Sequence, residues 1–156
     1  MVLLDKQGIL KGVVFPEYKA DQTEQVETLR KQMAYFWHDA FHFIKAMGRG
    51  QLWFAYGQLE VLRRICLNLA RLDHNFSDGC VGDEPHFKIE QALPVEDLAP
   101  LRATFCSMEY EAILQAGKTI FQFYQALAPR LAQRYDIPYH IDLERMVMAH
   151  LEKLNR

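Results

Sequence analysis

The chain has 156 residues, half of them hydrophobic and 12% aromatic, with a formal net charge of -2 at pH 7. This length and composition exclude a disordered chain and predict one folded domain over residues 1–156. The nearly balanced charge gives no electrostatic reason to expect nucleic acid as a partner.

The cysteines and the N-terminal residues predict a cytoplasmic protein. Cys66, Cys80 and Cys106 show no C-x-x-C spacing and, being three, cannot all pair within the chain. A reduced, cytoplasmic location is therefore expected. Asp5 and Lys6 interrupt the first apolar run too early for a signal peptide. No segment approaches the roughly 20 apolar residues of a membrane span, so we expect no membrane partner.

Residues 1–16 are predicted to form a short extended hairpin. Val2 and its neighbours are strand-like, Gly8 suits the turn, and a second strand-like run is ended by Pro16. A two-stranded hairpin is only marginally stable alone. We therefore expect it to pair with the rest of the chain, with a second copy, or with a sheet in another protein.

Residues 21–73 are predicted to form two long helices joined at the Gly48-Arg49-Gly50 turn. Asp21 and Glu24 form a D-x-x-E capping box that starts the first helix, and the second helix is expected to end near Asp73. Both helices carry apolar residues at the i, i+3, i+4, i+7 spacing of a buried face. These residues are Met33, Phe36, Trp37, Ala40, Phe41, Ile44, Met47, Leu52, Tyr56, Leu59, Leu62, Ile65, Cys66, Leu69 and Leu72.

The rest of the chain predicts shorter and longer helices in alternation. A polar loop follows the second helix, a helical turn is expected within 85–93, and Pro94 opens a short helix. Ser107 is the expected N-cap of a third long helix, which Pro129 should kink or split. A last helix is expected over 141–154. The predicted fold is an all-α, antiparallel up-and-down bundle of four to six helices over residues 21–156. Its last helix should bury Leu143, Met146, Val147, Leu151 and Leu154.

The polar faces of the two long helices and the loop after them hold the candidate binding residues. Aromatic rings mixed with charge on a helical hairpin are typical of a ligand surface, but also of an ordinary amphipathic exterior. Trp53 and Tyr56 are suited to stack on a ring-bearing ligand, and Arg63 to take part in a buried ion pair or a pocket. The candidates are His38, His42, Lys45, Arg49, Trp53, Tyr56, Glu60, Arg63 and His86.

A metal site is not expected, although His38 and His42 have the i, i+4 spacing that can bind zinc. A third ligand would have to come from His74 or His86. The loop that holds these two histidines also carries acidic groups that suit a cationic, amine-rich ligand, although a plain solvated loop is the preferred interpretation. The acidic residues are Asp78, Asp83 and Glu84.

Several short motifs together resemble one family. They are V-L-L-D-K-Q-G at 2–8, Phe36-Trp37, the Gly-flanked Arg49, the paired arginines at 63–64 and the tail at 131–139. In these the chain is similar to the C-terminal helical part of aminoglycoside adenylyltransferase-like nucleotidyltransferases, which is related to the HEPN group. The resemblance implies a bundle that packs on a catalytic domain and lines the substrate pocket. Such bundles also occur as separate subunits, so the expected partners are a small polar ligand, a nucleotidyltransferase subunit or a second copy in a homodimer.

The catalytic motifs of that family are missing from this sequence. The family pairs a Gly-Ser motif at a helix N-terminus, which holds the triphosphate, with two carboxylates on a strand, which hold magnesium. Here Asp142-x-Glu144 and Glu109-x-Glu111 fall in predicted helices. We therefore expect a substrate-binding module that does not transfer nucleotides alone and holds no cofactor of its own.

Two alternatives remain open. Arg134 and His140, with five residues between them, satisfy the R-x(4–6)-H pattern of HEPN ribonucleases. In such toxins the histidine acts in acid–base chemistry on an RNA 2′-hydroxyl. The third interpretation is an inactive remnant of an adenylyltransferase-like enzyme.

Overall fold

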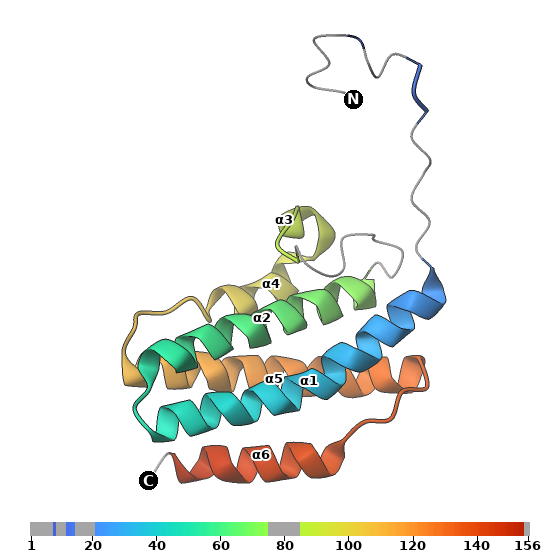
Figure 1. Cartoon of the computed structure of the whole chain (residues 1–156). Coiled ribbons are helices and arrows are strands. Elements are labelled where there is room, and N and C mark those ends of the chain that lie inside the picture. The colour runs from blue at the N-terminus through green and yellow to red at the C-terminus, as the bar shows by residue number, and fades with distance from the viewer. Residues whose placement is uncertain (1–7, 9–11, 15–20, 75–84, 155–156) are drawn as a thin grey trace.

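The computed structural model describes residues 8, 12–14, 21–74 and 85–154 (Figure 1). Within these ranges every regular element is a helix, which confirms the all-α prediction. The predicted hairpin over 1–16 lies almost wholly outside the described residues, and of its strands only Val13 and Val14 are described, both exposed. The helices are α1 (Gln22–Gly48), α2 (Leu52–His74), α3 (Ile89–Ala92), α4 (Val95–Arg102), α5 (Tyr110–Arg134) and α6 (Ile141–Lys153).

The hairpin of α1 and α2 forms for the reasons that the sequence suggests. Asp21 is the N-cap of α1, and its Oδ1 accepts a hydrogen bond from the Thr23 amide at 2.8 Å. At the other end of α1 the Gln51 amide donates to the Ala46 carbonyl at 2.9 Å. Gly50 takes φ +65°, a left-handed conformation that favours glycine. The predicted break between the two helices is confirmed.

Three long helices, α1, α2 and α5, enclose the core, while α6 packs on α1 and α4 packs on α2 and α5 (Figure 1). Aromatic rings join α1 to α5: Phe36 stacks on Tyr124 with centroids 3.5 Å apart, and Trp37 meets the same ring edge-on at 5.2 Å. The Tyr124 hydroxyl donates to the Met33 carbonyl at 3.1 Å. Burial raises the pKa of this hydroxyl.

Two sequence predictions are wrong in detail. The N-cap of α5 is Glu109, two residues after Ser107. Pro129 was predicted to kink or split the third long helix, and α5 runs through it without a break from Tyr110 to Arg134, so the helix is not split there. Leu143 and Met146 are exposed at 41% and 44%, since α6 packs mainly on α1 and buries only a narrow stripe.

None of the described helices combines the length and the apolarity that crossing a membrane requires.

Candidate functional site

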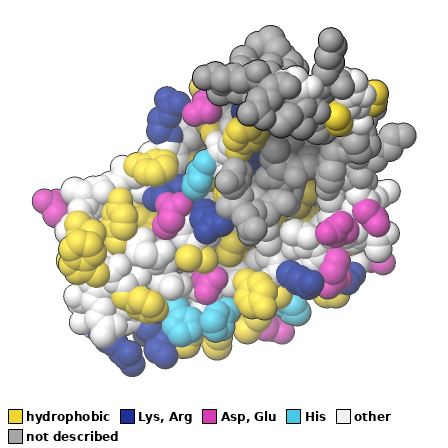
Figure 2. Space-filling model, turned by 45° about the horizontal axis from the view of Figure 1, so that its top comes forward, with side chains coloured by type: hydrophobic (Ala, Val, Ile, Leu, Met, Phe, Trp, Pro, Cys, Tyr) yellow, Lys and Arg dark blue, Asp and Glu magenta, His cyan; other side chains and the backbone are white. Residues whose placement is uncertain are grey.

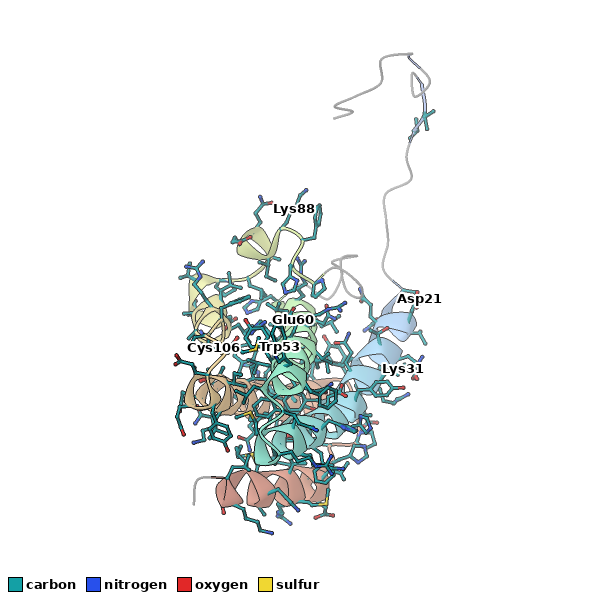
Figure 3. The ribbon with its side chains drawn as sticks, turned by 60° about the vertical axis from the view of Figure 1, so that its left-hand side comes forward. Asp21, Lys31, Trp53, Glu60, Lys88 and Cys106 are labelled. Carbon is teal, nitrogen blue, oxygen red and sulfur yellow. The ribbon has the colours of Figure 1, made fainter. Side chains whose placement is uncertain are left out.

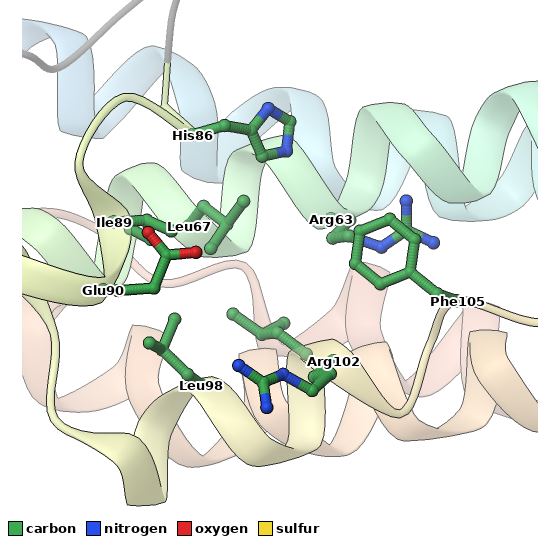
Figure 4. Close-up of a pocket in the computed structure, with 9 residues that line it drawn as sticks. Arg63, Leu67, His86, Ile89, Glu90, Leu98, Arg102 and Phe105 are labelled. Atoms are coloured by element: carbon green, nitrogen blue, oxygen red, sulfur yellow. The ribbon is translucent and has the colours of Figure 1, made fainter.

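A pocket of about 200 Å³ lies between α2, the turn that leads into α3, and α4. Figure 4 shows Glu90 from α3 and Arg102 from α4 directed toward its centre, with Arg63 and Phe105 side by side at one end. Acidic, basic and histidine side chains also lie close together on the face shown in Figure 2. The pocket is lined by Arg63, Leu67, His86, Ile89, Glu90, Leu98, Leu101, Arg102 and Phe105.

Arg63 on α2 is the central polar group of this pocket, and it is only 2% exposed. Its Nε donates to the Thr104 hydroxyl at 2.7 Å and its Nη2 to the Thr104 carbonyl at 2.9 Å. A third nitrogen forms an ion pair with Glu60, one turn earlier. The guanidinium also lies over the Phe105 ring, 4.1 Å from the centroid. The buried charge is thus fully engaged and ties α2 to the end of α4.

Thr104 connects Arg63 to α4 through hydrogen bonds. Its side chain is completely buried, and its hydroxyl donates to the Leu101 carbonyl at 2.5 Å while accepting from Arg63. The hydroxyl therefore uses its donor and an acceptor position inside the protein. This chain of hydrogen bonds fixes the wall of the pocket formed by α4.

His86 and Glu60 meet at the rim. The His86 Nε2 lies 3.7 Å from Glu60 Oε1, and both side chains are roughly half exposed. Because Glu60 also pairs with Arg63, the three residues form a continuous polar rim that leads from solvent to the buried guanidinium. Such a rim offers both a carboxylate and an imidazole to a polar ligand.

A second buried arginine holds the opposite side of the pocket. Arg71 on α2 is 1% exposed, its Nε donates to the Pro85 carbonyl at 2.9 Å, and its Nη2 donates to the Phe87 carbonyl. Residues 85–87 are thereby held against α2, immediately before Lys88, which starts α3 with φ +51°. Sequence reasoning missed Arg71, although a charged residue on the apolar face of a helix is a signal for a buried donor.

The nine predicted binding residues do not form one site. Glu60, Arg63 and His86 come together at the pocket, whereas the other six lie along α1 or near the α1–α2 turn. His38 and His42 pack ring against ring, with centroids 4.6 Å apart. The other four are Lys45, with its Nζ 5.3 Å from the Phe41 ring centre, the exposed Arg49, Trp53, and the half-buried Tyr56.

Within the described ranges of the chain, no group of three or more His, Cys, Asp or Glu side chains is placed to hold a metal ion. His38 is instead engaged by Asp39, whose Oδ1 lies 3.2 Å from its Nδ1.

The two residues of the ribonuclease pattern have different surroundings. Arg134 forms an ion pair with Asp73, at 2.7 Å between Nη1 and Oδ1, and so ties the end of α5 to the end of α2. A hydrogen bond with Tyr135 and the charge of Asp73 raise the pKa of the guanidinium. His140 is exposed at the N-cap position of α6, and its side chain makes no capping hydrogen bond.

In the carboxylate pair at the start of α6, Glu144 has a packing role, whereas Asp142 is exposed. Glu144 accepts from the Tyr139 hydroxyl at 2.6 Å and from the Gln125 amide at 2.7 Å. Burial, followed by the carboxylate of Glu144, raises the pKa of Tyr139. These bonds connect α6 to α5. In the other pair, Glu109 stands at the N-cap position of α5, and its side chain makes no capping hydrogen bond.

A family model described as streptomycin adenylyltransferase matches residues 1–154. Among the curated proteins, none matches the chain.

Proposed function

Because the chain belongs to the streptomycin adenylyltransferase family, we propose that it is a substrate-binding helical domain for nucleotidyl transfer. The ligand is a small polar molecule bound in the pocket between α2, α3 and α4. One observation carries this proposal: Arg63, His86, Glu90 and Arg102 approach the same cavity from separate segments, between apolar walls. A concave apolar site with a few converging polar groups is typical of small-molecule binding.

The pocket suits part of a larger polar ligand that contains rings. Glu90 supplies hydrogen-bond acceptors and Arg102 supplies donors, while Phe105, backed by the Arg63 guanidinium, presents an aromatic face. A volume of about 200 Å³ is smaller than the roughly 300–1,000 Å³ of pockets for drug-sized molecules. It therefore fits one ring of an aminoglycoside, with cationic groups of the ligand facing Glu60 and Glu90.

The chemistry of transfer is assigned to a nucleotidyltransferase domain or subunit outside these 156 residues. The sequence contains no Gly-Ser motif followed by paired carboxylates on a strand. Its two closely spaced carboxylate pairs lie at the starts of α5 and α6, where Glu144 is already bonded to Tyr139 and Gln125. The chain alone is therefore expected to bind the acceptor substrate without adenylylating it.

Streptomycin binding tests the proposal directly. A ligand at a hundredfold excess over its Kd stabilises the folded protein by about 2.7 kcal/mol. For a domain of this size that raises the melting temperature by roughly 5–11 °C. Glu90→Gln and Arg102→Gln should weaken streptomycin binding in calorimetry and leave the unliganded melting temperature unchanged, because both side chains are exposed.

Matched controls lie on α6, away from the pocket. Glu152→Gln and Arg145→Gln remove the same charges from exposed positions and should bind streptomycin like the wild type. No stabilisation by streptomycin or related aminoglycosides, or equal losses in pocket and control variants, contradicts the assigned pocket. Adenylylated product from the isolated chain with ATP and magnesium contradicts the assignment of catalysis to residues outside this sequence.

A further inference from the structure

A second cavity, of about 340 Å³, lies beside the pocket along α4. Glu90, Leu98 and Arg102 line both spaces, and Figure 4 shows Glu90 on α3 above Leu98 and Arg102 on α4. Figure 3 shows α3, with Lys88 at its start, projecting from the bundle beyond Glu60 of α2. This neighbouring cavity, the second compartment, is lined by Glu90, Val95, Leu98, Ala99, Arg102 and Ala103.

The periodicity of α4 explains why the two spaces adjoin. Residues four apart share one face of a helix. Leu101 lines the pocket alone, Leu98 and Arg102 line both spaces, and Val95 and Ala99 line the second compartment alone. Around the axis of α4, the second compartment therefore begins where the pocket ends, and Leu98 and Arg102 form the boundary between them.

The two spaces differ in chemistry. Besides the shared charges, the pocket contains the buried Arg63 and the half-exposed His86. The residues that line the second compartment alone are all apolar, namely Val95, Ala99 and Ala103. Val95 is 78% exposed, so a ligand that covers it removes apolar surface from water. The second compartment therefore suits a less polar group than the pocket does.

The two charged residues at the boundary are available to a ligand. Glu90 and Arg102 are both exposed, and neither forms a hydrogen bond or an ion pair in the described part of the chain. The Glu90 carboxylate offers acceptors to an ammonium or guanidinium group, and the Arg102 guanidinium offers donors to hydroxyl or ether oxygens. Polar atoms that link two rings of a ligand would therefore find partners at this boundary.

We propose that the second compartment determines which ligands the pocket accepts, on the premise that the pocket binds one ring of a ligand as proposed above. The ligand has two linked rings: a cationic, polar ring in the pocket, and a less polar ring, such as a deoxy or methylated sugar, over Val95 and Ala99. Glu90 and Arg102 bind the atoms between the rings. The observation that carries the proposal is an apolar space that shares the charged boundary of the pocket.

The size of the two spaces supports a ligand with two rings. The pocket of about 200 Å³ is too small for such a ligand. Together with the adjoining 340 Å³, it reaches the range of roughly 300–1,000 Å³ that drug-sized ligands occupy. Ala99 matters most for this space, because alanine has no atoms beyond Cβ and any larger side chain would enter the second compartment.

Titration calorimetry with two probes tests the proposal. Streptomycin carries sugars on a guanidino-bearing ring, and streptidine is that ring alone. The wild type should bind streptomycin at least about tenfold more tightly, which is what covering roughly 60 Å² of apolar surface contributes. Ala99→Trp fills the second compartment and should weaken streptomycin binding by about the same factor, while the affinity for streptidine stays unchanged. Ala99→Leu should give a smaller loss of the same kind.

Ala149→Trp is the matched control, since Ala149 is exposed on α6, away from both spaces. It should bind both probes like the wild type. Equal affinities of the wild type for the two probes overturn the proposal, as does streptomycin binding that Ala99→Trp leaves unchanged. Equal losses for both probes in Ala99→Trp also overturn it, because the substitution then acts on the pocket itself. If neither probe binds the wild type, the assigned pocket is wrong and this proposal falls with it.

Discussion

Replacing Arg63 by lysine should destabilise the protein, although the charge is kept. The guanidinium makes two hydrogen bonds to Thr104, at 2.7 and 2.9 Å, pairs with Glu60 and covers the Phe105 ring. A lysine ammonium is a point donor and cannot span these partners. At least one buried Thr104 oxygen then loses its Arg63 bond at about 1–3 kcal/mol, and the ring contact loses about 0.5–1 kcal/mol. We therefore expect a loss of about 2–4 kcal/mol and a melting temperature lower by roughly 5–15 °C.

Urea unfolding followed by circular dichroism measures this loss. Arg145→Lys, on a side chain that is 74% exposed, is the matched control and should lie within about 0.5 kcal/mol of the wild type. Thr104→Val should cost less in the Arg63→Lys background than in the wild type, because the two residues act as one unit. If Arg63→Lys unfolds like the control, the guanidinium does not hold α4 to α2 and the reasoning fails.

Two further predictions concern the helix core and pH. Gly117→Ala should destabilise the protein by about 1–3 kcal/mol in thermal or urea unfolding, because the added Cβ would lie 2.4 Å from the buried Phe43 ring. Gly57→Ala is the control and should stabilise the protein by up to about 1 kcal/mol. A change in unfolding free energy of the same sign for both variants contradicts this packing. Burial and the hydrogen bond to Glu144 raise the pKa of Tyr139 in the folded protein above its ordinary value of 10.0. The contribution of the protonated Tyr139 to folding stability is therefore complete below pH 10. It is lost as the pH rises above 10, because the unfolded chain then gives up the Tyr139 proton more readily than the folded protein. Melting temperatures measured across that range should fall more steeply for the wild type than for Tyr139→Phe, and parallel curves would refute the coupling.

The helices were predictable because apolar spacing repeats over many turns. Asp21 and Gly50 mark the ends of α1, and both have the conformations that their side chains favour. Errors occur where spacing alone does not say how wide the buried face is. Leu143 and Met146 continue the apolar pattern of α6, but that helix lies at the edge of the bundle and has one main neighbour, so they remain exposed.

The pocket was only partly predictable. Arg63 was expected to be buried or in a pocket, and it is both, because it lies on the apolar side of α2. Glu90, Arg102 and Phe105 were not singled out, since α3 and α4 are short and their place over α2 follows from tertiary contacts rather than from spacing. The α1 candidates His38, His42 and Lys45 were grouped with the site because a helical pattern predicts which side chains share one face of a helix. It does not predict which neighbouring element covers that face.

The acceptors of the two buried arginines explain why the pocket should keep its shape when its lining residues are substituted. Arg63 and Arg71 both lie on α2, and each donates to main-chain carbonyls, those of Thr104, Pro85 and Phe87. Backbone acceptors persist whatever side chains the segment 85–105 carries, so substitutions there leave most of these bonds intact. Residues such as Glu90 and Arg102 can therefore change ligand preference at little cost in stability. Changes at either arginine instead leave buried carbonyls unpaired and release one side of the pocket.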